Sequence, residues 1–450
     1  MSKESNVSLT EGNIFKQLLK FVWPIMVANV FEQIYNLTNA MIVGNYVSKE
    51  ALSAVSASST ISNVYNYLFY GLGLGSGIVI ATYYGAKRKD KIKESIETSL
   101  IIAVLGGILL TIISQLLIPF LMDVSNIKPE LYDLAHDYLS VYVLGTAAVL
   151  TYKMCFFILR SIGDSKTPLK YLVISCVINL MLGIIFVRFL NLSVIGTALA
   201  TIISQFIADI LCLRKLLTLK EVQFDIKNIN FSWRIFSKIC SLGIPAGIQN
   251  MLIAISTMMV QSYVNLLPNE YIAGIGVSDR ISVFAHIPMG AVSTVTINMV
   301  SQNMGAKLYE RAQQVIKDSI KICNVITLIT STILFITAPF WVSLFNKDPL
   351  IISAGATAIR IIVYSYIPLG WSHVYHGAIR GAGNVREPMM IAIFTQCICR
   401  YLFVYCGLKL FPGNVYVIYM SSAFGFTLAG IIASLYFHNS KWTKEKRLRA

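Results

Sequence analysis

The chain has 450 residues, of which 56% are apolar and only 13% are charged, and its mean hydropathy is +0.66. Soluble globular proteins carry about 25% charged residues, so this composition excludes an ordinary soluble domain. The formal net charge of +15 would suit a nucleic-acid-binding protein, but the basic residues follow the pattern of a membrane protein, so no nucleic-acid partner is expected.

Twelve apolar stretches of about 20–30 residues follow one another, and each is long enough to cross about 30 Å of hydrocarbon. They lack the alternation of barrel strands, so the sequence predicts an all-α polytopic membrane protein. The predicted spans are 15–43, 51–82, 94–120, 131–160, 166–190, 193–217, 234–265, 271–303, 313–340, 353–380, 386–410 and 414–438.

Lys and Arg residues concentrate on one set of alternate loops. One such loop holds five of them from Lys87 to Lys93, and the C-terminal tail holds five from Lys441 to Arg449. The opposite loops contain only Lys49, Lys128, Arg188, Lys347 and Lys409. The positive-inside rule then places both termini of a multi-pass cell-membrane protein in the cytoplasm. The first span lacks a small-residue cleavage site, so we expect it to be retained.

The first span carries a polar face. Its polar residues are three or four positions apart, which places them on one side of a helix. They are Asn29, Glu32, Asn36 and Asn39. A charged group at mid-bilayer costs at least about 2.5–3.5 kcal/mol on insertion scales, so Glu32 is a functional candidate. A desolvated carboxyl could hold and release a proton; alternatively, Glu32 pairs with a basic group such as Lys153 and stabilises packing.

The second span has glycine at every other position from Gly71 to Gly77. Because no strand precedes it, the run does not read as a phosphate loop, and close helix packing is the preferred interpretation. A second hypothesis is that this run and Pro24 make the first lobe flexible while the second lobe moves as a rigid body.

Short motifs recur 220 positions further along the chain. Residues 85–87 match 305–307, and the Arg-x-x-Gly…Pro motif of 160–168 returns at 380–388. The Arg, Gly and Pro that both copies of this motif share are typical of a turn between two helices. Repeats of this kind predict two parallel, pseudo-symmetric six-helix lobes. The predicted parts are lobe 1–217, a cytoplasmic linker at 218–233 and lobe 234–450 with its basic tail.

Lys153 in the fourth span and His373 in the tenth are repeat mates, and His376 lies one turn after His373. Repeated polar positions are expected to face a cleft shared by the lobes. Two His residues without a third ligand are a weak pattern for zinc, so no metal site is expected. Asp209 in the sixth span is expected to pair with Arg214 or Lys215 near the interface.

These motifs carry a family resemblance over essentially the whole chain. The chain resembles the multidrug and toxic compound extrusion (MATE) transporters. The matching elements are the duplicated turn, 196–205 in the sixth span, 301–306 closing the eighth, and Gln33-Ile-Tyr35-Asn36…Val43-Gly44 in the first. The resemblance implies a MATE-like fold of twelve helices and antiport of organic compounds against H⁺ or Na⁺ through a cleft that alternates sides.

The resemblance also implies site residues and one departure. Similar transporters have a cation-binding Asp where this chain has Asn39, and a second Asp where it has Gly183. The cation-coupling candidates are Glu32, Tyr35, Asn36, Asn39, Asn179 and Thr201. The substrate-cleft candidates are Lys153, Gln249, Asn250, Gln261, His373 and His376.

The preferred interpretation is therefore a secondary antiporter that needs no bound cofactor and no ATP. Its expected partners are an organic substrate, a coupling cation and the lipid bilayer. A monomer is expected. One alternative is a flippase for a lipid-linked or polysaccharide precursor. Another is a membrane-embedded enzyme, which is disfavoured because no convergent Ser/His/Asp, His or paired-carboxylate set is visible.

Overall fold

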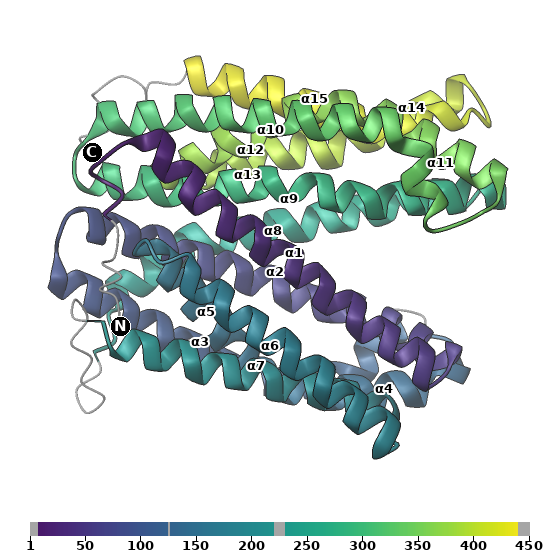
Figure 1. The fold of residues 1–450 in the computed structure, drawn as a ribbon, viewed down its shortest axis with the longest axis horizontal. Coiled ribbons are helices and arrows are strands. Elements are labelled where there is room, and N and C mark those ends of the chain that lie inside the picture. The colour runs from purple at the N-terminus through teal and green to yellow at the C-terminus, as the bar shows by residue number, and fades with distance from the viewer. Residues whose placement is uncertain (1–7, 125–126, 220–229, 440–450) are drawn as a thin grey trace. The chain divides into compact units, whose positions relative to one another are not determined.

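The computed structural model describes residues 8–124, 127–219 and 230–439. These residues form helices, and no β-strand occurs among them (Figure 1). Most of the predicted linker and the basic tail lie outside the described residues. The helices are α1 (Ile14–Tyr46), α2 (Lys49–Gly85), α3 (Lys89–Val124), α4 (Pro129–Leu144), α5 (Thr146–Ser161), α6 (Lys166–Ile184), η1 (Ile185–Phe189), α7 (Ser193–Leu217), α8 (Trp233–Val264), α9 (Asn269–Gly305), α10 (Tyr309–Ser343), α11 (Pro349–Ile362), η2 (Val363–Ser365), α12 (Tyr366–Gly381), α13 (Arg386–Ala392), η3 (Ile393–Cys399), α14 (Arg400–Leu410) and α15 (Val415–Asn439).

The described helices confirm the predicted twelve membrane spans. Eleven are long and apolar enough to cross a membrane, and α4 with α5 makes a twelfth that is bent by 52°. The bend lies at Gly145, where an added Cβ would be 2.3 Å from Cγ1 of Ile202, so the close approach of α7 requires a glycine. In the second half, the 3-10 turn η2 interrupts the span at Ser365, which is 220 positions after Gly145.

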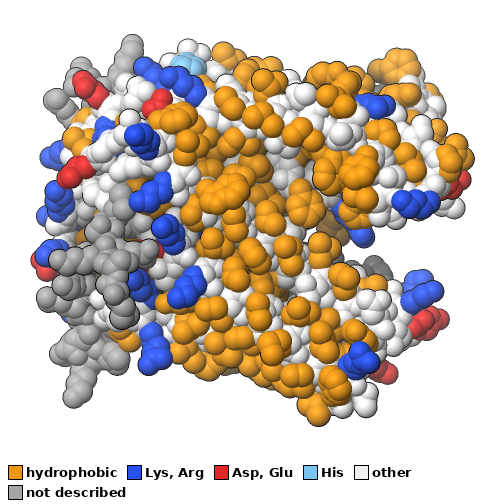
Figure 2. Space-filling model, viewed as in Figure 1, with side chains coloured by type: hydrophobic (Ala, Val, Ile, Leu, Met, Phe, Trp, Pro, Cys, Tyr) orange, Lys and Arg blue, Asp and Glu red, His pale blue; other side chains and the backbone are white. Residues whose placement is uncertain are grey.

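Hydrophobic side chains cover the middle of the helices, and Lys and Arg side chains gather at one end (Figure 2). Leu116 and Ile336, again 220 positions apart, are 76% and 68% exposed. Large apolar side chains exposed in such numbers are unfavourable in water and favourable in lipid. The surface therefore agrees with a membrane-spanning chain.

Contacts divide the chain into two compact units. Unit 1 contains Val27–Gly247, and unit 2 contains Leu9–Met26 together with the chain from Ile248 onward. The predicted lobes, 1–217 and 234–450, follow the order of the sequence repeat. The contacts differ from this order: the first half of α1 belongs to unit 2, and the first half of α8 belongs to unit 1. Both helices change units two residues after a proline, Pro24 or Pro245.

Each unit contains the turn that the repeated motif predicts. Gly163 and Gly383 both have φ of 90°, a backbone conformation that glycine adopts without strain. The N–H of Gly163 donates to the carbonyl of Arg160 at 3.1 Å, and Gly383 donates to Arg380 at 2.8 Å. These bonds satisfy carbonyl groups at the end of a helix. The interpretation of the motif as a turn is confirmed in both copies.

The glycine run of α2 is a helix-packing surface in unit 1. An added Cβ at Gly71 would lie 2.3 Å from the carbonyl oxygen of Gly243, and one at Gly75 would lie 2.5 Å from the carbonyl oxygen of Ile239. The backbones of α2 and the first half of α8 therefore touch, as small residues allow. The close-packing interpretation is confirmed, and the asymmetric flexibility of the lobes stays a prediction.

At one repeated contact the two units use large and small residues differently. In unit 1, an added Cβ at Gly73 of α2 would lie 2.4 Å from Cδ2 of Phe157 on α5. In unit 2, the equivalent residues are Ser293 of α9 and Gly377 of α12, where an added Cβ would lie 2.9 Å from the Ser293 carbonyl oxygen. The glycine is thus on the second span of one repeat and on the fourth span of the other. Either arrangement fills the space between two helices.

Candidate ion and substrate sites

Three helices of unit 1 bring polar side chains together. The hydroxyls of Tyr35 on α1 and Ser204 on α7 lie 3.1 Å apart. Thr201 Oγ1 accepts hydrogen bonds from the side-chain amides of Asn39 at 3.3 Å and Asn179 at 3.4 Å. We call these five residues the amide–hydroxyl cluster. Four of the predicted cation-coupling residues are therefore neighbours in space.

Helix geometry explains why these side chains meet. Tyr35 and Asn39 are one turn apart on α1, and Thr201 and Ser204 are one turn apart on α7. Thr201 Oγ1 also donates to the carbonyl of Thr197 at 2.9 Å. A hydroxyl has one donor and two acceptor positions, so this single group is saturated by three bonds.

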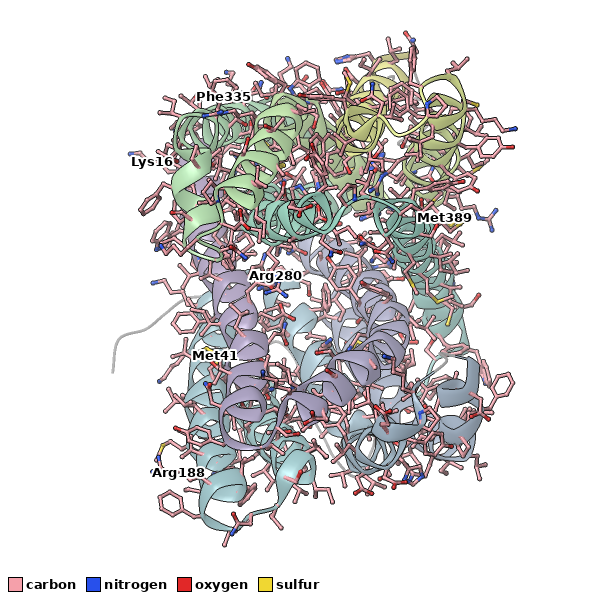
Figure 3. The ribbon with its side chains drawn as sticks, turned by 90° about the vertical axis from the view of Figure 1, so that its right-hand side faces the viewer. Lys16, Met41, Arg188, Arg280, Phe335 and Met389 are labelled. Atoms are coloured by element: carbon pink, nitrogen blue, oxygen red, sulfur yellow. The ribbon has the colours of Figure 1, made fainter. Side chains whose placement is uncertain are left out.

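The end of α1 packs beside the segment formed by α6 and η1. Figure 3 labels Met41 on α1 and Arg188 on η1, and the Arg188 guanidinium lies over the Tyr46 ring at 5.5 Å. At Gly183, where the resemblance implies an acid, an added Cβ would lie 2.8 Å from Cδ1 of Ile42. An apolar side chain of α1 therefore occupies the space beside this position.

Several oxygen atoms in and beside the cluster have no hydrogen-bond partner among the described residues. They are Asn39 Oδ1, Asn179 Oδ1 and Gln205 Oε1, and each atom is buried. A buried acceptor without a partner costs about 1–3 kcal/mol. Amide and hydroxyl oxygens are ligands for small hard cations, so this arrangement could accept one.

Glu32 and Asn36 are exposed and lie outside the cluster. Glu32 is near enough to Lys153 and Arg160 to attract both charges, but within the described residues it forms no ion pair closer than 4 Å. Lys153 instead donates to Asn66 Oδ1 at 2.8 Å. The alternative of a Glu32–Lys153 ion pair is therefore wrong here, while the role of Glu32 in holding and releasing a proton stays a prediction.

The expected interfacial pair of Asp209 with Arg214 or Lys215 is also wrong. Asp209 is only 5% exposed, whereas Arg214 is exposed. The carboxyl points toward α5, where Cys155 Sγ lies 3.9 Å from its Oδ1. The reason is the helix face: Asp209 follows the buried Ala208, while Arg214 lies on the opposite side of α7.

The substrate-cleft candidates of the seventh span do not lie together in unit 2. Gln249 is buried and accepts a hydrogen bond from Arg380 Nη2 at 2.6 Å. Gln261 is exposed and donates to Asn265 Oδ1 at 3.0 Å, about 18 Å further along α8 at 1.5 Å per residue. Asn250 is half-buried. Gln249 thus holds the arginine of the repeated turn.

Three histidines of unit 2 lie on α12 and α9. His376 is buried, and its Nδ1 is 3.4 Å from Ser372 Oγ. His373 is half-buried, and its carbonyl accepts a hydrogen bond from Ser293. His286, which the sequence analysis did not select, packs edge-on against the Tyr366 ring with centroids 5.4 Å apart. Within the described residues, no group of three His, Cys, Asp or Glu could hold a metal ion.

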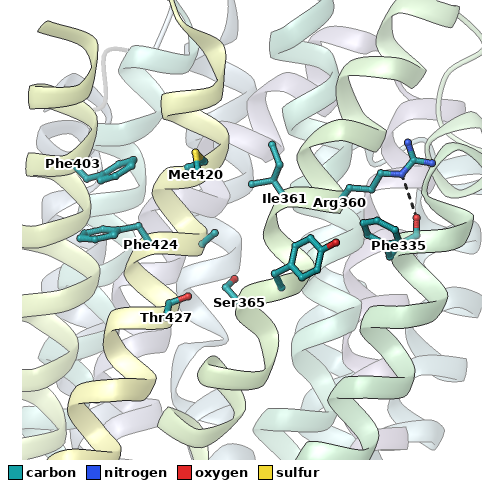
Figure 4. Close-up of a pocket in the computed structure, with 10 residues that line it drawn as sticks. Phe335, Arg360, Ile361, Ser365, Phe403, Met420, Phe424 and Thr427 are labelled. Atoms are coloured by element: carbon teal, nitrogen blue, oxygen red, sulfur yellow. Dashed lines mark hydrogen bonds between the residues drawn. The ribbon is translucent and has the colours of Figure 1, made fainter. Parts of the chain in front are cut away.

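An apolar pocket of about 570 Å³ lies elsewhere in unit 2, among α10, α11, α14 and α15 (Figure 4). Phe403, Met420 and Phe424 form one side, and Arg360 at the other side donates to the Phe335 carbonyl at 3.3 Å. None of the predicted substrate-cleft residues lines this pocket.

Sequence reasoning missed three residues in unit 1. Ser204 and Gln205 were quoted as part of a motif without a role, and Asn66 was not selected. The available signal was spacing: Ser204 and Gln205 lie one turn beyond Thr201 on α7. Asn66 gives no such signal, because only the packing of α2 on α5 brings it to Lys153.

The comparisons with known proteins decide the family. The family model MatE matches residues 24–185 and again 245–406. The two matches are offset by 221 positions and begin at Pro24 and Pro245, which agrees with the internal repeat. The chain belongs to the MatE family. Members of this family are transporters, so the enzyme alternative is excluded.

Relatives match this MatE chain over nearly its full length. A curated protein of Bacillus subtilis named "Probable multidrug resistance protein YpnP" is 27% identical, with 97% of this chain and 98% of that protein covered. Two solved structures share 21% identity and cover both chains completely. One, "MATE in the bent conformation", has a TM-score of 0.93, and the other, an outward-facing multidrug resistance MATE family transporter, has 0.92. At this identity they establish the MATE fold.

Proposed function

We propose that this MatE protein is a secondary antiporter that exports organic compounds, such as drugs or toxic metabolites, in exchange for H⁺ or Na⁺. The observation that carries the proposal is the amide–hydroxyl cluster. Oxygens from α1, α6 and α7 converge there, and two amide oxygens lack hydrogen-bond partners among the described residues. A site of neutral oxygens suits a monovalent cation, which would enter it as a transported ion.

Family membership supports the export of organic compounds, and the name of the Bacillus relative points the same way. Alternating access, in which two homologous lobes expose the substrate site first to one side of the membrane and then to the other, would account for the internal repeat. We place the protein in the cell membrane with both termini in the cytoplasm, because the basic residues lie on one set of loops. The ion gradient supplies the driving force, so the monomer would need neither a bound cofactor nor ATP.

The test uses purified protein in proteoliposomes with an imposed Na⁺ or pH gradient. A compound panel that includes cationic, anionic and lipid-linked molecules identifies the substrate class, and the lipid-linked compounds probe the flippase alternative. Export that depends on one gradient is the expected result. Export of the same compounds at the same rate without any gradient would contradict antiport.

A substitution at Glu32 distinguishes coupling to H⁺ from coupling to Na⁺. Glu32→Gln is expected to abolish pH-driven export and to leave membrane insertion intact, because Glu32 is the only acid on the polar face of α1. Glu50→Gln is the control, since Glu50 is an exposed acid in the first turn of α2. Full pH-driven export by Glu32→Gln would remove Glu32 from the mechanism.

A further inference from the structure

Asp209 is a buried carboxyl group to which the exchange cycle described above gives no role. It lies on α7 and is 5% exposed. The polar contact of its Oδ1 is Cys155 Sγ on α5, at 3.9 Å. In the described chain, no Lys or Arg forms an ion pair with it within 4 Å.

The groups around Asp209 do not supply a counter-charge. The titratable groups that interact with Asp209 are two thiols, those of Cys155 on α5 and Cys212 on α7. The further acid near this group, Asp164 in the turn between α5 and α6, interacts with the Cys212 thiol and carries the same sign of charge as Asp209. Arg160, a buried cation on α5, stacks on the Phe156 ring with its guanidinium carbon 3.6 Å from the ring centroid.

An ionised carboxylate in this position is expensive. Burying a charge without a counter-ion costs several kcal/mol even after relaxation, and the surrounding bilayer supplies no water to offset it. A thiol is only a weak hydrogen-bond donor. Binding one proton removes the charge and leaves a neutral acid that such surroundings tolerate.

A polar column on α7 connects Asp209 with the amide–hydroxyl cluster. Thr201, Gln205 and Asp209 follow one another at intervals of four residues, so they lie on one face about 6 Å apart along the axis. Gln205 lies beside the phenol of Tyr35, and its buried Oε1 has no hydrogen-bond partner in the described structure. Beyond Asp209, the last turn of α7 carries Arg214 and Lys215.

We propose that Asp209 is a proton-binding site, and that Gln205, which lies between it and the amide–hydroxyl cluster on one face of α7, couples its charge state to that cluster. A hydronium ion gives its proton to a carboxylate oxygen of Asp209 and becomes water, and the proton later leaves to water at the basic end of the helix, restoring the carboxylate. This inference rests on the proposed antiport, to which it adds the position of a second acid besides Glu32.

Infrared spectroscopy of the purified protein tests the site without a gradient or a substrate. A protonated carboxyl gives a carbonyl stretch that shifts in heavy water and disappears when the group ionises. We expect this band in the wild type and in Asp137→Asn, whose acid is exposed on α4, and its loss in Asp209→Asn. Asp209→Glu, which keeps a carboxyl, should give a displaced band. A band that is the same in Asp209→Asn and in the wild type would overturn the proposal.

Transport assays then connect the site with function. Asp209→Asn should lose the dependence of export on an imposed pH gradient, while Asp209→Glu retains it in part. An unchanged pH profile in Asp209→Asn would overturn the coupling of Asp209 to transport. If the wild type exports nothing under any gradient, the proposed antiport fails, and the infrared result still decides whether Asp209 binds a proton.

Discussion

At the residue scale, one hydroxyl holds the amide–hydroxyl cluster together. Thr201 Oγ1 accepts from Asn39 and Asn179 and donates to the Thr197 carbonyl. Because both amides donate to the same oxygen, their own carbonyl oxygens remain without partners in the described structure. Thr201 thus fixes the direction in which two potential cation ligands point.

Replacing Thr201 by Val should uncouple transport and lower stability. The change keeps the side-chain shape but leaves two buried amide groups without their acceptor, at a cost of about 1–3 kcal/mol. We expect a lower thermal unfolding temperature and loss of cation-driven export. Thr201→Ser keeps the hydroxyl and serves as the control. Unchanged unfolding and export in Thr201→Val would show that the hydroxyl does not organise the cluster.

At the element scale, equivalent helix pairs of the two units reach close packing with different residues. Gly73 faces Phe157 in unit 1, and Ser293 faces Gly377 in unit 2. A buried hydroxyl pair beside this contact is kept in both: Ser76 with Ser99 at 2.5 Å, and Thr296 with Ser319 at 2.9 Å. The polar contact has thus been preserved while the sizes of the neighbouring side chains have changed.

This difference predicts a coupled pair of mutations. Gly73→Ser alone should destabilise unit 1, because its Cβ would overlap the Phe157 ring. Phe157→Gly alone should leave a cavity, at a cost of about 3–5 kcal/mol. The double variant reproduces the residues of unit 2 and should lose less than the sum of the two single losses. Thermal unfolding measures all three, and additive losses would contradict the coupling.

At the scale of the whole molecule, the internal repeat is visible in the structure as well as in the sequence, because structural features recur at the same offset along the chain. The turns at Gly163 and Gly383, the breaks at Gly145 and Ser365, and the changes of unit after Pro24 and Pro245 all recur at 220 or 221 positions. The predicted polar repeat mates do not share a common environment in the same way. Lys153 bonds to Asn66, whereas His373 is bonded through its carbonyl.

The prediction that Lys153 and His373 face one central cavity can be tested by labelling. Single cysteines at these positions, in a background without the eight native cysteines, should react with a small membrane-impermeant thiol reagent. Substrate should protect both, because repeat mates are expected to line the same path. A cysteine at Leu116, which is apolar and 76% exposed, is the lipid-facing control. If substrate protects neither cysteine from the reagent, the prediction of a shared cavity is wrong.

The sequence by itself determined the number of spans, the two repeats and the turns. Hydropathy over 20 residues and the need for glycine at positive φ are local properties, so a linear pattern expresses them. It also selected Tyr35, Asn39, Asn179 and Thr201, because family spacing and helix periodicity give the face of a helix on which a residue lies.

Only the tertiary structure decided which neighbour covers each face. Asp209 and Glu32 are both acids in predicted spans, yet α5 covers Asp209 and leaves it without a counter-charge, while Glu32 is exposed. The exchange of the first halves of α1 and α8 between units was equally invisible in the sequence. Periodicity fixes the direction of a side chain about its own helix, but its burial and partners depend on how several helices pack together.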